Sequence, residues 1–333
     1  MPLVSVVIPL YQTERYIGAA VRSVLAQTFE DFEVIVVDDG SSDGGPEIVA
    51  SIKDARVRLV RQENRGLAGA RNTGIRESAG LYIALLDADD LWHPRKLERL
   101  LRILDREPDV GLAFSASRFV DDNGAPIGLV QRPKRNEFAA HDVFCRNPVG
   151  NGSAPILRRI ALDEISFFDE RICRVCWFDE SFRQSEDIEC WTRIATLTNW
   201  RFAFLDEALT DYRVNTNGLS ANTDRQLETW RRFRSKVAGY APALERRYGN
   251  HAEAYQLRYL ARRAVRAKTS SAPALRMMLQ AIALSPRILL DEPARTGTTL
   301  AAAILQRALP SPIFARLEAW AIERSSRIAG LQV

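Results

Sequence analysis

Three carboxylates stand within four residues where an apolar stretch ends. Residues 81–86 are followed directly by Asp87, Ala88, Asp89 and Asp90. A short apolar stretch closed by turn-forming residues is typical of a buried strand whose carboxyl end reaches solvent. Like charges a few ångströms apart repel each other unless a cation lies between them, and hard oxygen ligands suit Mg²⁺ or Mn²⁺. The pattern predicts a metal-bound, phosphorylated substrate at this strand end.

The residues before this acidic segment alternate between strand and helix patterns. β-Branched residues at 4–9 predict a strand, and Thr13 is a suitable N-cap for the helix that follows. Further strands are expected at 33–37 and 57–61, and further helices at 46–53, at 67–78 and from Pro94 onward. The alternation predicts βαβ units, and therefore an α/β fold with a mostly parallel sheet flanked by helices.

Polar segments follow the carboxyl ends of the predicted strands, at 9–14, 38–42, 64–71 and 87–90. Open α/β sheets bind ligands along that rim, so the segments should converge on one crevice. Asp39 either caps a following helix or accepts hydrogen bonds from a base or ribose. The glycines around Arg71 allow a phosphate to approach a helix N-terminus, although neither the P-loop nor the GxGxxG order is present.

A second acidic segment lies at 178–191 and contains Asp179, Glu180, Glu186 and Asp187. Acids in the first turn of a helix are favourable because of the helix dipole, and this structural role explains them without any chemistry. A carboxylate at that position is also a candidate for general acid or base catalysis. The residues alone leave both interpretations open.

Together these segments resemble the family 2 inverting glycosyltransferases of GT-A fold, over residues 3–215. The resemblance rests on Val4-Ser-Val-Val-Ile-Pro-Leu-Tyr11, Ser23-Val-Leu-Ala-Gln-Thr28, Val36-Val-Asp-Asp-Gly-Ser41, Arg65-Gly66 with Ala70-Arg-Asn-Thr-Gly74, Leu86-Asp-Ala-Asp-Asp90 with Trp92, and Phe178-Asp-Glu180 with Glu186-Asp187. So many motifs in the same order make chance agreement very improbable.

The resemblance implies a metal-dependent enzyme that moves a sugar, with inversion, from a nucleotide-diphosphate sugar to a hydroxyl group. A UDP-sugar is the preferred donor, a saccharide or lipid-linked saccharide is the acceptor, and the product belongs to surface polysaccharide or glycolipid synthesis. By the same match Asp39 recognises the base, Asp87 lies beside the ribose, Asp89 binds Mn²⁺ or Mg²⁺, and Asp187 is the catalytic base. The residues that line the nucleotide pocket are Pro9, Tyr11, Glu14 and Arg71.

Charge divides the sequence into two regions. Residues 224–333 hold 19 Lys and Arg against 8 Asp and Glu, whereas residues 1–223 hold 27 against 34. We expect a catalytic domain at 1–220, with a nucleotide-binding half at 1–110 and an acceptor-binding half at 111–220. A basic, mainly helical region should follow at 221–333. Its charge indicates a solvated face, binding to an anionic membrane surface, or self-association. Binding to nucleic acid is disfavoured because the acidic residues 1–223 would repel it.

The chain begins without a basic, cleavable leader, and no apolar stretch approaches about 18 residues. We therefore expect a cytoplasmic protein, either free or attached peripherally to the membrane. Cys173 and Cys176 have metal-ligand spacing but lack a second pair of ligands, so zinc is disfavoured. They lie in an insertion between two Phe-Asp-Glu copies, at 168–170 and 178–180, and we assign the family motif to the second copy.

A sugar nucleotidyltransferase is disfavoured because it would carry a glycine- and lysine-rich loop after the first strand. A catalytically inactive sugar- or membrane-binding protein is disfavoured because it would not need Asp39, Asp89 and Asp187 together. His93 and His141 are weak candidates for metal ligands. Arg213 either reaches the diphosphate or forms a salt bridge at a strand end. Asp90 is expected mainly to cap the helix that follows it.

Overall fold

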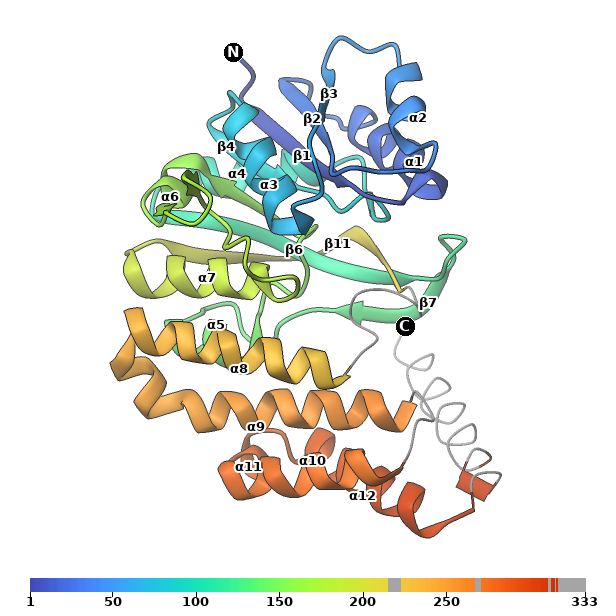
Figure 1. Ribbon diagram of the computed structural model, residues 1–333, viewed down its shortest axis with the longest axis vertical. Coiled ribbons are helices and arrows are strands. Elements are labelled where there is room, and N and C mark those ends of the chain that lie inside the picture. The colour runs from blue at the N-terminus through green and yellow to red at the C-terminus, as the bar shows by residue number, and fades with distance from the viewer. Residues whose placement is uncertain (215–222, 267–270, 311–312, 315, 317–333) are drawn as a thin grey trace. The chain divides into compact units, whose positions relative to one another are not determined.

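The structure is a computed structural model that describes residues 1–214, 223–266, 271–310, 313–314 and 316. Contacts divide the chain into two compact units, Met1–Leu219 and Ser220–Val333, and each is described by itself. The first unit is built on a mixed sheet with helices on both faces, and the second is helical (Figure 1).

Within the described residues, nine strands form the main sheet of the first unit. Its first half is parallel, in the order β3-β2-β1-β4, and its second half continues as β8-β6-β11-β5 with both pairing directions. Strand β7 pairs antiparallel with β6. The strands are β1 (Val4–Leu10), β2 (Phe32–Asp38), β3 (Val57–Arg61), β4 (Tyr82–Leu85), β5 (Leu91–Trp92), β6 (Val110–Val120), β7 (Pro126–Gln131), β8 (Pro155–Arg158) and β11 (Arg201–Arg213).

Strand β1 is buried along its whole length because helices cover both faces of the sheet. Val6 belongs to one hydrophobic core, which it shares with α1 (Glu14–Leu25), α2 (Gly45–Ser51) and α4 (Lys96–Arg106). Val7 belongs to the other core, which it shares with α3 (Gly66–Glu77), α5 (Ala140–Arg146), α6 (Arg159–Asp163) and α7 (Glu186–Leu197). A Cβ added at Gly74 would lie 2.2 Å from Val7 Cγ1, so this glycine lets α3 approach the sheet closely.

Apart from the short β5, the strands and helices of the first 106 residues lie where the sequence pattern predicts them, within a few residues at each end. The segment 110–155 is more regular than its turn-rich sequence indicates, because it contains β6, β7 and α5. A β-turn joins β6 to β7, with Gly124 N–H donating to the Asp121 carbonyl over 2.9 Å, as the Asp-Asp-Asn-Gly sequence predicts.

The insertion forms a small antiparallel hairpin of β9 (Phe167–Asp169) and β10 (Arg174–Cys176). Cys173 lies in its turn with φ of 50°, and both Cys173 and Cys176 are free thiols. Phe168, from the first Phe-Asp-Glu copy, is 60% exposed, whereas Phe178, from the second copy, is fully buried. The second copy is therefore the one that packs into the core.

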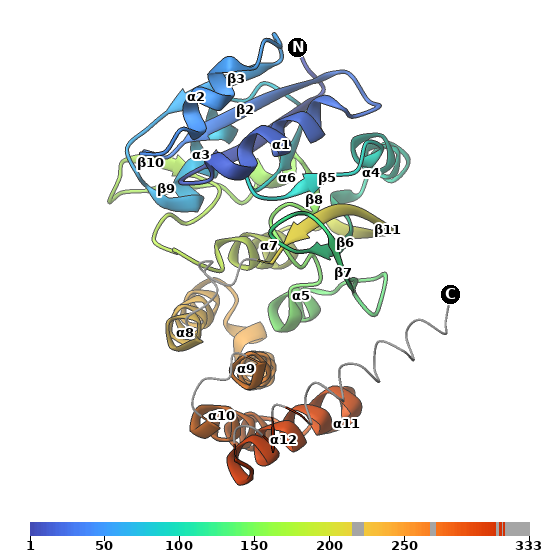
Figure 2. The same ribbon diagram turned by 90° about the vertical axis from the view of Figure 1, so that its right-hand side faces the viewer.

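The second unit consists of α8 (Thr223–Tyr240), α9 (Pro242–Arg266), α10 (Ser271–Leu284), α11 (Ile288–Asp291) and α12 (Pro293–Ala308). Figure 2 looks nearly along the axes of α8 and α9. Helix boundaries fall at Pro242, Pro286 and Pro293, because proline cannot donate to the preceding turn. In the part of the chain that the structure describes, no helix is both long and apolar enough to cross a membrane.

Candidate active site

The buried guanidinium of Arg71 joins two distant parts of the first unit. Its Nη2 donates to Asp87 Oδ1 over 2.7 Å, at the end of β4, and its Nη1 donates to Glu186 Oε1 over 2.8 Å, at the start of α7. Only 1% of the Arg71 side chain is exposed. Burial lowers the pKa of Arg71, but the charges of Asp87, Glu186 and Asp187 outweigh burial and raise that pKa above its ordinary value.

Glu186 and Asp187 occupy the first turn of α7, as the acidic pattern predicts. Burial raises the pKa of Glu186 to about 7, against the opposing effect of Arg71. Burial also raises the pKa of Asp187, again against Arg71. Asp187 Oδ2 accepts a hydrogen bond from Asn147 Nδ2 over 3.4 Å. A half-buried carboxylate with a raised pKa is a better proton acceptor than an ordinary aspartate.

Asp90 does not cap the helix that follows it, so that expectation is wrong. The N-cap of α4 is Arg95, without any side-chain cap. Instead the buried Asp90 carboxylate accepts hydrogen bonds from Arg213 N–H over 2.8 Å and from Ser153 Oγ over 2.6 Å. Burial and then the charges of Asp89 and Asp87 raise its pKa. Asp90 therefore fastens the acidic turn to β11 and to the segment before β8.

Lys96 holds together the segment before β8 and strand β11, the two parts of the chain that also bond Asp90. Its buried Nζ donates to the carbonyls of Ser153 and Ala154 and to Thr210 Oγ1, over 2.9, 2.9 and 2.6 Å. Burial lowers the pKa of Lys96, and Asp90 opposes that shift. A fully buried lysine of this kind is retained only where hydrogen bonds compensate the loss of water.

The acids at the end of β4 fit a metal that arrives with its substrate. Asp89 is half-buried and stands in the same turn as Asp87 and the buried Asp90, so three carboxyl groups gather there. Among the described residues, no group of three or more His, Cys, Asp and Glu side chains could hold a metal ion. Mg²⁺ commonly takes one or two carboxylates and completes its shell with water and substrate phosphates. The donor set thus suits a metal–diphosphate complex.

Asp39 accepts three hydrogen bonds at the start of α3. Its Oδ1 accepts hydrogen bonds from Arg65 N–H and Gln62 Nε2 over 2.8 and 2.6 Å, and its Oδ2 accepts one from Gly66 N–H over 2.8 Å. Gly66 has φ of +77°, a conformation that favours glycine. Asp39 therefore supports a helix N-terminus, and a carboxylate with about four lone-pair positions retains room for a further donor.

Three other expected pocket residues lie near the end of β1. Pro9 is buried and pairs in register with β2, whereas Tyr11 is 51% exposed just beyond the strand. Glu14 is exposed, and its Oε2 accepts a hydrogen bond from Gly44 N–H over 2.7 Å at the start of α2. The carboxylate of Glu14 is thus directed at α2 in this structure.

Sequence reasoning missed Gly152, which packs directly against Arg71. A Cβ added at Gly152 would lie 2.1 Å from Arg71 Nη2 and 3.4 Å from Asp87 Oδ2. The run Gly-Asn-Gly-Ser at 150–153 offered a signal, since small residues before a strand often mark a close approach. Asn72 was missed as well: its side chain bonds the main chain of Trp177 and Phe178 and so docks the second Phe-Asp-Glu copy onto α3.

Arg213 is directed at main-chain carbonyls. Its Nε donates to the Asp89 carbonyl over 2.8 Å, and its Nη1 donates to the Asp121 carbonyl over 2.7 Å. Its guanidinium lies 4.5 Å from the ring centroid of Tyr16. These contacts fix the main chain of Asp89 and the turn after β6.

Comparison with known proteins identifies the family. Residues 5–166 match glycosyl transferase family 2. The uncharacterised glycosyltransferase EpsJ of Bacillus subtilis is 30% identical over 254 residues, which cover 72% of this chain and 70% of EpsJ. The chain belongs to glycosyl transferase family 2. An uncharacterised glycosyltransferase of Rickettsia felis is 32% identical over 213 residues, and this match spans only 33% of that longer protein and 64% of this family 2 chain.

Solved structures show the same fold. TarS of S. aureus (residues 1–349), in complex with UDP-GlcNAc, has a TM-score of 0.58 at 19% identity, covering 92% of both chains. Mannosyltransferase PcManGT from Pyrobaculum calidifontis, in complex with GDP-Man and Mn²⁺, also has a TM-score of 0.58, at 24% identity, covering 92% of this chain and 86% of PcManGT. At these identities the likeness establishes the GT-A fold of this family 2 member.

The site of this family 2 chain combines some of the predicted residues and separates others. Arg71 brings Asp87 together with Glu186, and Asp187 is the next residue of α7. The other predicted residues, Asp39, Tyr11 and Glu14, lie just beyond β1 and β2. The carboxylates of Asp39 and Glu14 each accept hydrogen bonds from main-chain N–H groups there. His93 is exposed and accepts a hydrogen bond from Arg95 N–H at the entry to α4.

Proposed function

We propose that this protein is a metal-dependent inverting glycosyltransferase that uses a nucleotide-diphosphate sugar, preferably a UDP-sugar. The observation that carries the proposal is the link through Arg71 between Asp87, at the rim where the donor would bind, and the acidic start of α7. The Escherichia coli relative WfgD, 28% identical over 68% of this chain, is named as a glucosyltransferase that uses UDP-Glc.

On the donor side, Asp89 would hold Mn²⁺ or Mg²⁺, and the bound cation would neutralise charge on the diphosphate leaving group. Asp87 would lie beside the ribose, and Asp39 with Pro9, Tyr11 and Glu14 would form the nucleotide pocket. Arg71 adds positive charge close to Asp87 and holds that carboxylate in place. The nucleotide-binding half would then be residues 1–110 and the acceptor-binding half 111–220.

On the acceptor side, Asp187 would accept the proton of the attacking hydroxyl group. The new bond forms between the acceptor oxygen and the anomeric carbon, while the bond from that carbon to the diphosphate oxygen breaks. The bonding electrons leave with the nucleoside diphosphate, and attack from the opposite face inverts the anomeric centre. The raised pKa of Asp187, which burial causes, strengthens it as a base late in the transition state.

The acceptor would be a saccharide or lipid-linked saccharide in surface polysaccharide or glycolipid synthesis, and the protein would work at the cytoplasmic membrane face. Two Escherichia coli relatives, WfgD and WfaP, are named for transfer to α-D-GlcNAc-diphosphoundecaprenol. They are 28% and 29% identical to this chain.

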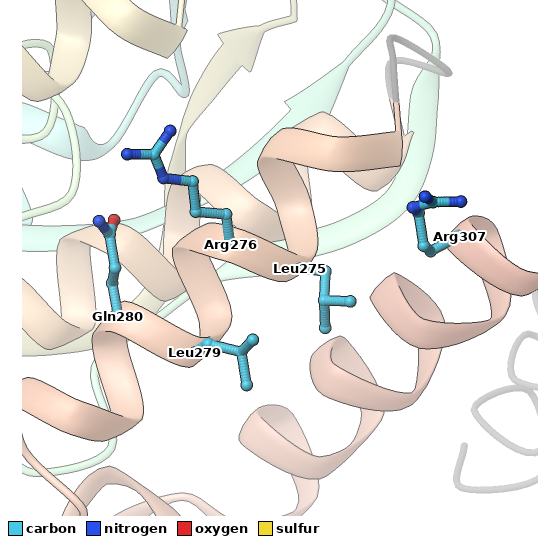
Figure 3. Close-up of a pocket in the computed structure, with 5 residues that line it drawn as sticks. All are labelled: Leu275, Arg276, Leu279, Gln280 and Arg307. Carbon is cyan, nitrogen blue, oxygen red and sulfur yellow. The ribbon is translucent and has the colours of Figure 1, made fainter.

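The C-terminal unit would assist by contact with anionic lipid. Part of its positive charge is already paired: Arg234 bonds Glu245 and Glu253, and the buried Arg258 bonds Glu292. A pocket on α10 and α12 instead combines Leu275, Leu279, Arg276, Gln280 and Arg307 (Figure 3). Such a mixture of apolar and cationic side chains suits a lipid surface. Co-sedimentation with phosphatidylglycerol vesicles at two salt concentrations tests this.

The test of catalysis combines binding with transfer. A panel of nucleotide sugars is scored by thermal shift with Mn²⁺, because a true donor stabilises the folded protein by mass action. With the donor so identified, Asp187→Asn should lower the transfer rate about 10²- to 10⁴-fold and leave the donor-induced shift intact. Transfer within a few-fold of wild type by the folded variant would show that Asp187 is not the base.

A further inference from the structure

Strand β7 exposes an apolar surface that its sheet leaves uncovered. Ile127, Leu129 and Val130 are 45%, 49% and 41% exposed. Within the described residues the sheet gives β7 a single neighbour, β6. The strand Pro-Ile-Gly-Leu-Val-Gln contains no charged residue, although edge strands are usually protected by charge. An exposed apolar edge of this kind marks a surface that contacts something else.

The strand is unsuited to pairing with a second strand. Pro126 has no N–H to donate, and Gly128 has φ of +75°, outside the extended region. Both interrupt the ladder of main-chain hydrogen bonds that a second copy of the chain would need. The apolar side chains stay available, so the surface suits a ligand that makes side-chain contacts only.

Both ends of β7 are connected to the candidate active site. At its carboxyl end, Gln131 Oε1 accepts a hydrogen bond from Asn151 Nδ2 over 3.4 Å, and Asn151 precedes Gly152, which packs against Arg71. At the other end, the turn before β7 holds the Asp121 carbonyl that accepts from Arg213, and Arg213 also donates to the Asp89 carbonyl. The apolar strand is therefore linked at both ends to segments that contact Arg71 or the main chain of Asp89.

Positive charge follows the apolar strand at once. Arg132, Lys134 and Arg135 are exposed and lie within four residues of each other. Arg132 pairs with Asp206 over 3.1 Å, but both side chains are more than half exposed, so this ion pair is weak and open to exchange. Exposed apolar side chains on a strand that is followed by cations complement an amphiphile with a long apolar chain and an anionic head.

We propose that β7 and residues 132–135 bind the lipid part of the acceptor, namely an isoprenoid-type chain joined to the sugar through a diphosphate. The chain lies on Ile127, Leu129 and Val130, and the diphosphate contacts Arg132 and Arg135. The sugar then reaches the segment before β8, beside Arg71. This inference rests on the proposed function and adds the place where the acceptor lipid is held.

The test uses the full chain and two water-soluble probes, farnesyl diphosphate and inorganic diphosphate, titrated by calorimetry. UDP and excess Mg²⁺ are present, so that the donor site is filled. Wild type should bind farnesyl diphosphate at least about tenfold more tightly than inorganic diphosphate, which corresponds to about 1.4 kcal/mol. The variant Ile127→Thr/Leu129→Thr/Val130→Thr should lose this preference, and Arg132→Gln/Arg135→Gln should weaken the binding of both probes.

A matched control replaces three apolar residues of the same unit that are also exposed, in Leu81→Thr/Ile160→Thr/Leu197→Thr, and it should keep the preference. Equal affinity of wild type for the two probes, or a preference that survives the β7 substitutions, overturns the proposal. Self-association that the β7 substitutions abolish in size-exclusion chromatography overturns it as well, because a second copy would then cover the strand. UDP binding is measured first, so failure of the proposed function is seen separately.

Discussion

The substitution Gly152→Ala should displace the Arg71 side chain although it replaces no charged residue. The added Cβ would lie 2.1 Å from Nη2, and Cβ atoms essentially never approach closer than 3.0 Å, so the guanidinium must move by about 1 Å. Its hydrogen bonds to Asp87 and Glu186 are 2.7 and 2.8 Å long, and such a movement breaks at least one of them. Losing a hydrogen bond between charged groups costs about 1.5–3 kcal/mol, and a 1 Å misplacement at a site can cost about 100-fold in rate.

The assay measures two quantities for Gly152→Ala: the transfer rate with the donor found by thermal shift, and the free energy of unfolding in urea. We expect kcat/KM to fall about 100-fold and the free energy of unfolding to fall by about 1.5–3 kcal/mol. Gly297→Ala is the control, because nothing lies within 4 Å of a Cβ at that helical position. It should leave activity unchanged and stabilise α12 slightly.

A double substitution makes the prediction specific to Arg71. If Gly152 acts only through Arg71, then Gly152→Ala/Arg71→Ala should be no less active than Arg71→Ala alone, because the displaced group is already absent. Losses that add would mean that Gly152 acts by another route. Wild-type activity and stability in Gly152→Ala would refute the close contact itself.

Three further predictions concern charge. Because burial raises the pKa of Glu186 to about 7, the folded protein binds more protons than the unfolded chain between about pH 4.5 and 7. The free energy of unfolding should therefore decrease by at most about 3 kcal/mol as the pH rises through that window. Urea titrations of Glu186→Gln at several pH values should lack this decrease. Asp90→Asn should stay within about 1 kcal/mol of wild type because burial favours a neutral group there, whereas Asp90→Ala should lose about 1–3 kcal/mol because Arg213 N–H loses its acceptor; equal losses in chemical denaturation would contradict this. Arg258→Ala should destabilise the C-terminal unit by about 1.5–3 kcal/mol because the buried Glu292 loses a hydrogen bond between charged groups, and an unchanged melting curve would exclude that role.

The sequence predicted the structure best where the pattern within a single strand or helix is sufficient to identify that element. Runs such as the one in β1 are rich in β-branched residues and buried on both faces, and the acids at 87–90 and 186–187 stand at element ends as expected. Strand β6 was not predicted, because its Ala and Ser residues have low strand propensity and its neighbours on both sides hold it in the sheet.

The roles of single side chains were harder to predict, because they depend on segments that are far away in the sequence. Asp90 resembles a helix cap locally, yet its partners are Ser153 and Arg213. The small residues around Gly152 indicate a close approach, but the sequence does not say that the partner is Arg71, because that contact forms only in the folded chain. Metal dependence, inversion and the identity of the acceptor stay predictions, as does the division into a nucleotide-binding and an acceptor-binding half.

The hydrogen bond between Arg71 and Glu186 also limits which residues between them can be replaced. The hairpin of β9 and β10 lies before α7 on this connection, and its exposed side chains contribute little to the core. Its exposed residues can therefore be replaced at little cost to folding, provided that α7 still begins with its acidic turn against Arg71. A fragment that ended before α7 would keep the parallel half of the sheet but leave Arg71 with Asp87 alone of its three neighbouring carboxylates. The parallel half thus depends on the later residues for its electrostatic stability as well as for chemistry.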